Sequence, residues 1–144
     1  MKNSLLLLDC LPTPELSPKY KIIYAGRGAV FERGLAAGII DVDFATVEGQ
    51  ARMLDWLRQN DIPERVKCSL DSPDFEGAAS EFLQAKVIGL TRVLEAALML
   101  NPSIQWEFVT AVNGDIWSQS CEAYFRTLVA GLKAQLPQAR ITFL

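Results

Sequence analysis

The chain has 144 residues, of which 50% are hydrophobic and 22% are charged, a balance typical of one globular domain rather than of a disordered or fibrous protein. Its net charge is −3 at pH 7 and its Lys and Arg residues are scattered, so no basic stripe is available to neutralise a row of phosphates, and nucleic acid is not expected as a partner. The longest apolar stretch is too short and too often interrupted by charge to cross a bilayer, so no membrane span is expected.

Histidine is absent from the sequence. This excludes every catalytic scheme that depends on an imidazole base or ligand. The three cysteines, Cys10, Cys68 and Cys121, are widely spaced and form no CxxC pattern, which favours free thiols over a disulfide framework or a zinc site. We expect Cys68 and Cys121 to be small core residues. The cysteine pattern predicts a protein without disulfides in the reducing cytoplasm.

Residues 4–25 are predicted to form a pair of strands. The leucine-rich run that ends at Asp9 is the first strand, and Tyr20 to Ala25 is the second. The segment between them, "LPTPELSP", contains three prolines and therefore favours a loop over a helix. So short a link is more typical of an antiparallel return than of a helical crossover. We therefore expect these two strands to be antiparallel.

From residue 39 to residue 144, strand and helix patterns alternate. Asp43 is the expected N-cap of the first helix and Ser72 that of the second, and the last helix is expected to begin at Asp115 or Ser118. The expected strands cover 39–43, 65–70, 104–112 and 140–144, and the expected helices cover 43–60, 72–100 and about 115–136. Together with the first pair, these elements predict a single α/β domain over 1–144, with a mixed sheet of about five strands flanked by three helices.

Polar residues follow several of the predicted strands, and in open α/β sheets ligands bind beyond the carboxyl ends of parallel strands. Three of the acids, Asp9, Asp41 and Asp71, are candidates to hold a hard divalent cation such as magnesium. Arg27 or Arg33 would then neutralise a phosphate. The candidate ligand-binding residues are Asp9, Cys10, Gly26, Arg27, Gly28, Arg33, Asn113 and Asp115.

Most of these residues also have a structural explanation. An acid such as Asp43 in or before a first turn stabilises a helix without any ligand. The stretch "AGRG" matches neither a Walker loop nor GxGxxG, and no helix pattern follows it directly. A tight turn that needs a glycine accounts for it with fewer assumptions.

Two functional interpretations follow from the sequence. The first is a small cytoplasmic α/β protein without catalysis or cofactor, which self-associates as a homodimer or docks to a protein partner through the apolar helix over 87–100. The alternative is a metal-assisted phosphate-handling enzyme or nucleotide-binding module that uses carboxylates at the strand ends. Whether the protein is an enzyme stays open at this stage.

Overall fold

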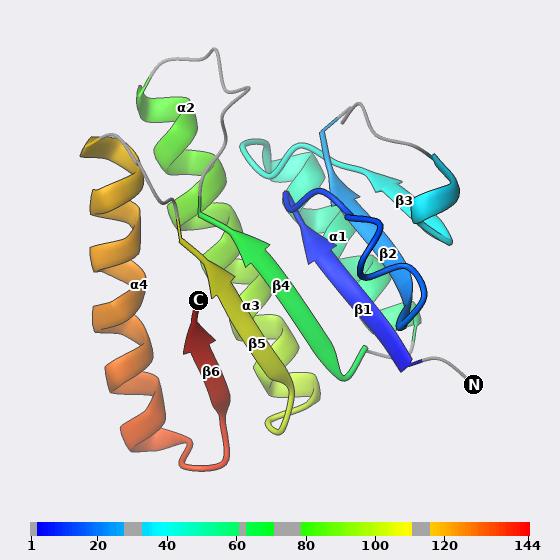
Figure 1. Ribbon diagram of the computed structural model, residues 1–144. Coiled ribbons are helices and arrows are strands. Elements are labelled where there is room, and N and C mark those ends of the chain that lie inside the picture. Colours follow the sequence, from blue (N-terminus) through cyan, green and yellow to red (C-terminus); the bar gives the residue numbers. More distant parts are fainter. Residues whose placement is uncertain (1–2, 28–32, 61–62, 71–78, 111–115) are drawn as a thin grey trace.

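The computed structural model describes residues 3–27, 33–60, 63–70, 79–110 and 116–144 (Figure 1). In this part of the chain, six strands form one sheet with the order β3-β2-β1-β4-β5-β6, and every neighbouring pair is parallel. The predicted α/β class is confirmed. The strands are β1 (Asn3–Leu8), β2 (Tyr20–Gly26), β3 (Gly38–Asp41), β4 (Arg65–Ser69), β5 (Gln105–Val109) and β6 (Arg140–Phe143).

Helices connect the strands from β3 onward. They are α1 (Val47–Gln59), the consecutive α2 (Ala79–Leu83), η2 (Gln84–Gly89, a stretch of π-helix) and α3 (Leu90–Leu100), and α4 (Ile116–Gln135). A short 3₁₀ turn, η1 (Arg33–Leu35), precedes β3. In Figure 1, α1 and α3 lie behind the sheet, and the dark blue loop over 9–19 crosses in front of β1 and β2. No helix in the described ranges is long and apolar enough to cross a membrane.

The expected antiparallel pairing of the first two strands is wrong, because β1 and β2 are parallel, with Leu5 opposite Ile22. The loop over 9–19 returns the chain from the carboxyl end of β1 to the amino end of β2 without forming a helix. Its turns are closed by backbone hydrogen bonds from the Leu16 amide to the Thr13 carbonyl (3.1 Å) and from the Tyr20 amide to the Leu16 carbonyl (3.0 Å). A compact turn of this kind provides a parallel crossover that is shorter than the usual helical one.

Strand β1 is buried on both sides, which explains its unbroken run of leucines. Leu6 and Leu8 belong to the main core between the sheet and the helices. Leu5 and Leu7 belong to a smaller cluster on the other face, against which Leu16 of the loop packs. The main core thus lies on the helical side, and the loop covers the opposite side of β1 and β2.

The face opposite the helices is polar along β4 and β5. Lys67 and Glu107 are cross-strand partners whose side chains form an ion pair with Nζ to Oε2 at 3.7 Å. Beside them, Arg65 Nε donates to Gln105 Oε1 at 3.1 Å, and Arg65 Nη1 donates to the Tyr20 hydroxyl at 2.7 Å. The alternation predicted for 65–70 therefore reflects a strand with one apolar and one polar face.

The N-cap of α1 and the position of Ser118 in α4 differ from the predictions. Thr46 rather than Asp43 is the N-cap of α1, since its hydroxyl accepts the Gly49 amide at 3.0 Å. Asp43 instead closes the preceding turn by accepting the Ala45 amide on Oδ1 at 2.9 Å. Ser118 lies inside α4 and is not its cap. Ser72 and Asp115, the other predicted caps, lie outside the described residues.

Candidate functional site

The carboxyl ends of the parallel strands meet at one edge of the sheet, where the arrows of Figure 1 point. From β1, the chain adds β2 and β3 on one side, and then crosses to add β4, β5 and β6 on the other. The direction in which successive strands are added to the sheet therefore reverses between β1 and β4. In open α/β folds, ligands bind at such a switch point, because the connections leave the two strands on opposite sides.

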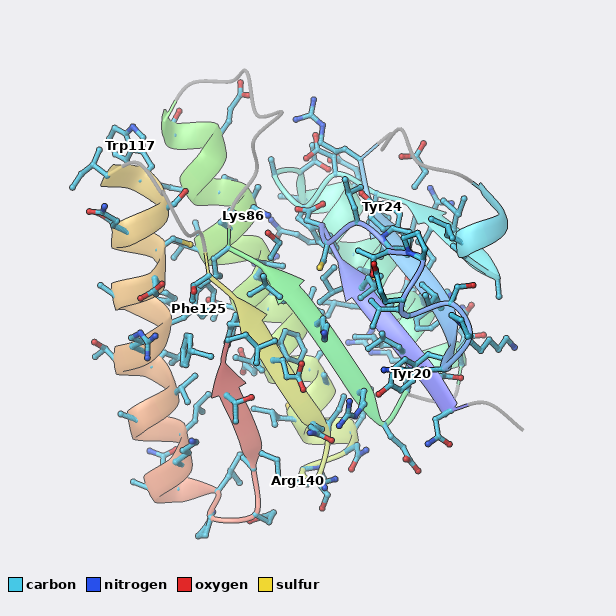
Figure 2. The ribbon with its side chains drawn as sticks, in the orientation of Figure 1. Tyr20, Tyr24, Lys86, Trp117, Phe125 and Arg140 are labelled. Atoms are coloured by element: carbon cyan, nitrogen blue, oxygen red, sulfur yellow. The ribbon has the colours of Figure 1, made fainter. Side chains whose placement is uncertain are left out.

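An ion pair joins the two sides of this switch point. Asp9 is the first residue after β1, and its amide donates to the Ala25 carbonyl at 2.9 Å. Lys86 comes from η2 and places its Nζ 3.3 Å from Asp9 Oδ2. The same Nζ donates to the Ser69 carbonyl, at the end of β4, at 2.9 Å. Figure 2 shows Lys86 at the end of β4, and the side chain of this lysine is only 1% exposed.

The local structure explains how a lysine reaches this position. The π-helical turn at η2 widens the helix, and such turns are frequent at functional sites. Gly89, at the end of η2, lets the helix approach the chain before α1, since a Cβ there would collide with the Phe44 carbonyl. A buried ammonium must be paired and hydrogen-bonded to be tolerated, and Asp9 and Ser69 supply both.

Tyr24 and Gly26 border the carboxylate of Asp9 on the β2 side. A Cβ at Gly26 would lie 2.5 Å from Asp9 Oδ1 and 2.5 Å from the Tyr24 hydroxyl oxygen, so the glycine leaves the room that these two groups occupy. The Tyr24 hydroxyl donates to the Arg27 carbonyl at 3.3 Å. Burial, and then the nearby charge of Asp9, raise the pKa of Tyr24 above its usual value, so this hydroxyl stays protonated at neutral pH.

Cys10 follows Asp9 and packs against the smaller apolar cluster. Burial raises the pKa of the Cys10 thiol, while the charges of Lys67 and Lys86 oppose that shift. The net result is a pKa above the ordinary value, so the residue is a thiol rather than a thiolate at neutral pH. Because the thiolate is the reactive form, the environment does not favour Cys10 as a nucleophile.

Three other predicted site residues lie at or near the ends of β2 and β3: Arg27 follows β2, Asp41 ends β3 and Arg33 precedes β3. Arg27 is 62% exposed and its Nε lies 3.9 Å from Asp43 Oδ2. Asp41 lies opposite Gly26 in the register of β2 and β3, and its side chain is exposed. Arg33 begins η1. Gly28, Asp71, Asn113 and Asp115 lie outside the described residues.

No group of three or more acidic or cysteine side chains that could hold a metal ion occurs within the residues that the structure describes. The proposed metal set of Asp9, Asp41 and Asp71 stays a prediction, since its third member lies outside those residues.

Sequence reasoning missed Lys86, the most deeply buried charged side chain of the site. It falls in "QAKVIGL", a segment whose pattern predicts only an apolar helix. A single lysine within an otherwise apolar helical face was the signal that could have identified it, because lysine is almost never fully buried unless it is paired. Its partner could not be inferred, since Asp9 and Lys86 meet only through the sheet order.

The strand order and its switch point define a Rossmann-type α/β domain. In such domains a glycine-rich turn after β1 leads into a helix, and the amides at the helix N-terminus bind a pyrophosphate. Here the segment over 9–19 contains no glycine and forms turns instead of a helix. The residues after β1 therefore do not fit the usual backbone mode of dinucleotide binding.

No protein-family model matches the sequence, and no curated protein matches it. Solved structures with a similar fold include alcohol dehydrogenases and short-chain dehydrogenases. The bulky-bulky ketone specific alcohol dehydrogenase from Comamonas testosteroni, in its tetragonal crystal form, has a TM-score of 0.70 at 12% identity, over 97% of this chain and 72% of that chain. BdcA from E. coli has a TM-score of 0.69 at 10% identity, over 98% and 79%. A short-chain dehydrogenase from Sphingobium yanoikuyae in complex with NADPH has a TM-score of 0.67 at 12% identity, over 96% and 68%.

These similarities correct the first functional interpretation. A non-catalytic binding or assembly domain is contradicted, because the fold is shared with dehydrogenases and reductases. Metal-assisted phosphate chemistry is not the class of these proteins either. At 10 to 14% identity the likeness establishes the fold and not the activity of this chain.

Proposed function

We propose that this chain is a Rossmann-type domain of the dehydrogenase and reductase class, and that it binds a nicotinamide nucleotide at the carboxyl edge between β1 and β4. The observation that carries the proposal is the all-parallel strand order with its reversal at β1 and β4. The NADPH-bound structure from Sphingobium yanoikuyae, which has the same fold, supports the choice of ligand class.

Side chains rather than a glycine-rich turn would contact the phosphates of this ligand. Lys86 supplies a cation at the switch point, and Arg27 supplies one directly after β2. An arginine near the end of β2 is suited to the 2′-phosphate that distinguishes NADPH from NADH. The proposed ligand is therefore NADPH in preference to NADH.

Titration with NADPH, NADH, NADP⁺ and NAD⁺, followed by calorimetry, is expected to show the tightest binding for NADPH. Changing Arg27 to alanine removes the cation for the 2′-phosphate and should weaken NADPH binding about tenfold, which is the order of one charge-assisted hydrogen bond, while NADH binding changes little. Arg58→Ala is the matched control, since Arg58 pairs with Asp55 within α1 and is equally exposed. If none of the four nucleotides binds the wild-type protein, the proposed function is wrong.

We also propose that the protein is cytoplasmic. We further propose that it forms a homodimer, whose contact surface is an apolar groove between α3 and α4. The groove has a volume of about 400 Å³. Met99 in its lining is 80% exposed. In a twofold dimer the same patch of both copies forms the contact, so one exposed apolar groove can pair with that of a second copy. Its apolar lining comes from Leu94, Leu98, Met99, Leu128, Leu132 and Leu136.

Sedimentation velocity at increasing protein concentration tests the dimer. The wild-type protein is expected to sediment as a dimer, and Met99→Glu is expected to sediment as a monomer because it places a charge in the apolar contact. Val47→Glu is the control, since Val47 is an apolar residue at the start of α1 that is 63% exposed and lies outside the groove. A dimer with a Kd of about 1 μM is mostly associated at a protein concentration of about 100 μM. A wild-type protein that stays monomeric at that concentration would contradict the proposed dimer.

A further inference from the structure

The ion pair at the switch point is not explained by stability alone. Replacing a buried ion pair with apolar residues of similar volume is often neutral or stabilising. Lys86 projects from a helix whose neighbouring buried residues, Ala85 and Gly89, are apolar, so a methionine would fill the same space. A charged pair at this position is therefore a candidate for a role in ligand binding at the carboxyl edge of the sheet.

The two partners differ in their access to solvent. The Lys86 side chain is 1% exposed, whereas that of Asp9 is 17% exposed. Asp9 is therefore the partner that contacts solvent in the described structure, while the Lys86 ammonium is covered.

The ammonium is also held independently of Asp9. Its Nζ lies 2.9 Å from the Ser69 carbonyl and 3.3 Å from Asp9 Oδ2, so the backbone contact is the shorter of the two. An ammonium has three N–H donors. Lys86 can therefore keep its place at the end of β4 when another anion replaces the carboxylate.

The Asp9 backbone is in the left-handed region, with φ at 50°. This conformation is unfavourable for a residue with a Cβ, although aspartate and asparagine tolerate it better than most. The hydrogen bond from the Asp9 amide to the Ala25 carbonyl does not involve the side chain, so it can persist when the carboxylate leaves Lys86.

From these contacts we propose that Asp9 is an internal counter-ion of the nucleotide site, and that a ligand phosphate binds by replacing the Asp9 carboxylate on the Lys86 ammonium. The inference rests on the proposed function for the location of the ligand, and it adds which side chains hold the phosphate. The exchange is of one anion for another, so the buried cation remains paired in both states. Affinity is then limited by competition from a residue of the protein itself.

Calorimetric titration with NADPH and, separately, with inorganic pyrophosphate tests the proposal on three variants. Asp9→Asn removes the competing charge but keeps the shape and the tolerance of a positive φ, so it should tighten binding of both ligands about tenfold. Lys86→Met removes the cation and should weaken binding of both about tenfold or more. In the double variant, the gain from Asp9→Asn should disappear, because it depends on Lys86.

The results separate this inference from the proposed function. If NADPH binds and neither Asp9→Asn nor Lys86→Met changes its affinity, the counter-ion role is wrong while the nucleotide site stands. If the wild type binds neither ligand and Asp9→Asn binds pyrophosphate, the counter-ion role is supported and the proposed function is wrong. If neither NADPH nor pyrophosphate binds to the wild type or to Asp9→Asn, both the counter-ion role and the proposed function are wrong. Asp9→Ser, which is also neutral, replaces Asp9→Asn if the latter does not fold by circular dichroism.

Discussion

Replacement of Phe108 with alanine is expected to lower the free energy of unfolding by about 3–5 kcal/mol, the range for removing a fully buried aromatic ring. Phe108 lies in β5 and is completely buried. The centroid of its ring lies 4.7 Å from that of Phe125 in α4 and 5.1 Å from that of Phe143 in β6. The ring therefore joins three elements of the main core, and its loss would leave a cavity that none of them can close alone.

Urea unfolding followed by circular dichroism measures this change. Ile116→Ala is the matched control, since Ile116 is 66% exposed at the start of α4 and its truncation should change stability by no more than about 0.5 kcal/mol. A loss below about 1 kcal/mol for Phe108→Ala would show that the aromatic cluster is not packed as the contacts indicate.

Two glycine-to-alanine changes are expected to have opposite signs. Gly49 is buried in the first turn of α1, and a Cβ there would collide with the backbone carbonyl of Asp43. We expect Gly49→Ala to destabilise the protein by about 1–3 kcal/mol, because overpacking against backbone exceeds the gain in helix propensity. Gly131 lies in α4, and a Cβ there would meet no heavy atom within 4 Å in the described residues. Gly131→Ala should therefore stabilise the protein by up to about 1 kcal/mol.

Thermal and urea unfolding of the two variants give the comparison. Both changes add one methyl group to a helical glycine, so the difference between them measures the crowding of a Cβ at Gly49 by Asp43 and Thr46. Equal shifts in the same direction would mean that the turn over 43–46 moves aside at little cost, and that its contact with α1 is loose.

The fold class could be predicted from the sequence because the hydrophobic period changes from strand to helix at several points after residue 39. The parallel pairing of β1 and β2 could not be predicted, because the length of the segment that links two strands only biases the choice between parallel and antiparallel pairing. The loop over 9–19 folds into turns and packs Leu16 on the sheet, which is a tertiary interaction. The sequence likewise indicated Asp43 as a cap, whereas Thr46 takes that role three residues later.

The position of the candidate site could be predicted in part. Asp9, Gly26 and Arg27 were selected because they follow strands, and they do lie at the carboxyl edge. Whether any of them binds a ligand stays a prediction. Their partners depend on the sheet order, which the sequence did not reveal: Asp9 pairs with Lys86, and Arg27 pairs with Asp43. Lys86 was hidden within a helix that hydrophobicity alone predicts as core.

The placement of β1 in the middle of the sheet has a consequence for folding. Leu8 pairs with Ala25 on one side and with Cys68 on the other, and the chain between β1 and β4 includes β2, β3 and α1. The pairing of β1 with β4 closes a long loop, so we expect it to be the slow step of folding, because contacts between residues distant in sequence form slowly. Until it forms, the leucine-rich edge of β1 is open to a strand from another molecule. Aggregation during refolding should therefore begin at β1, the strand that is best protected in the native protein.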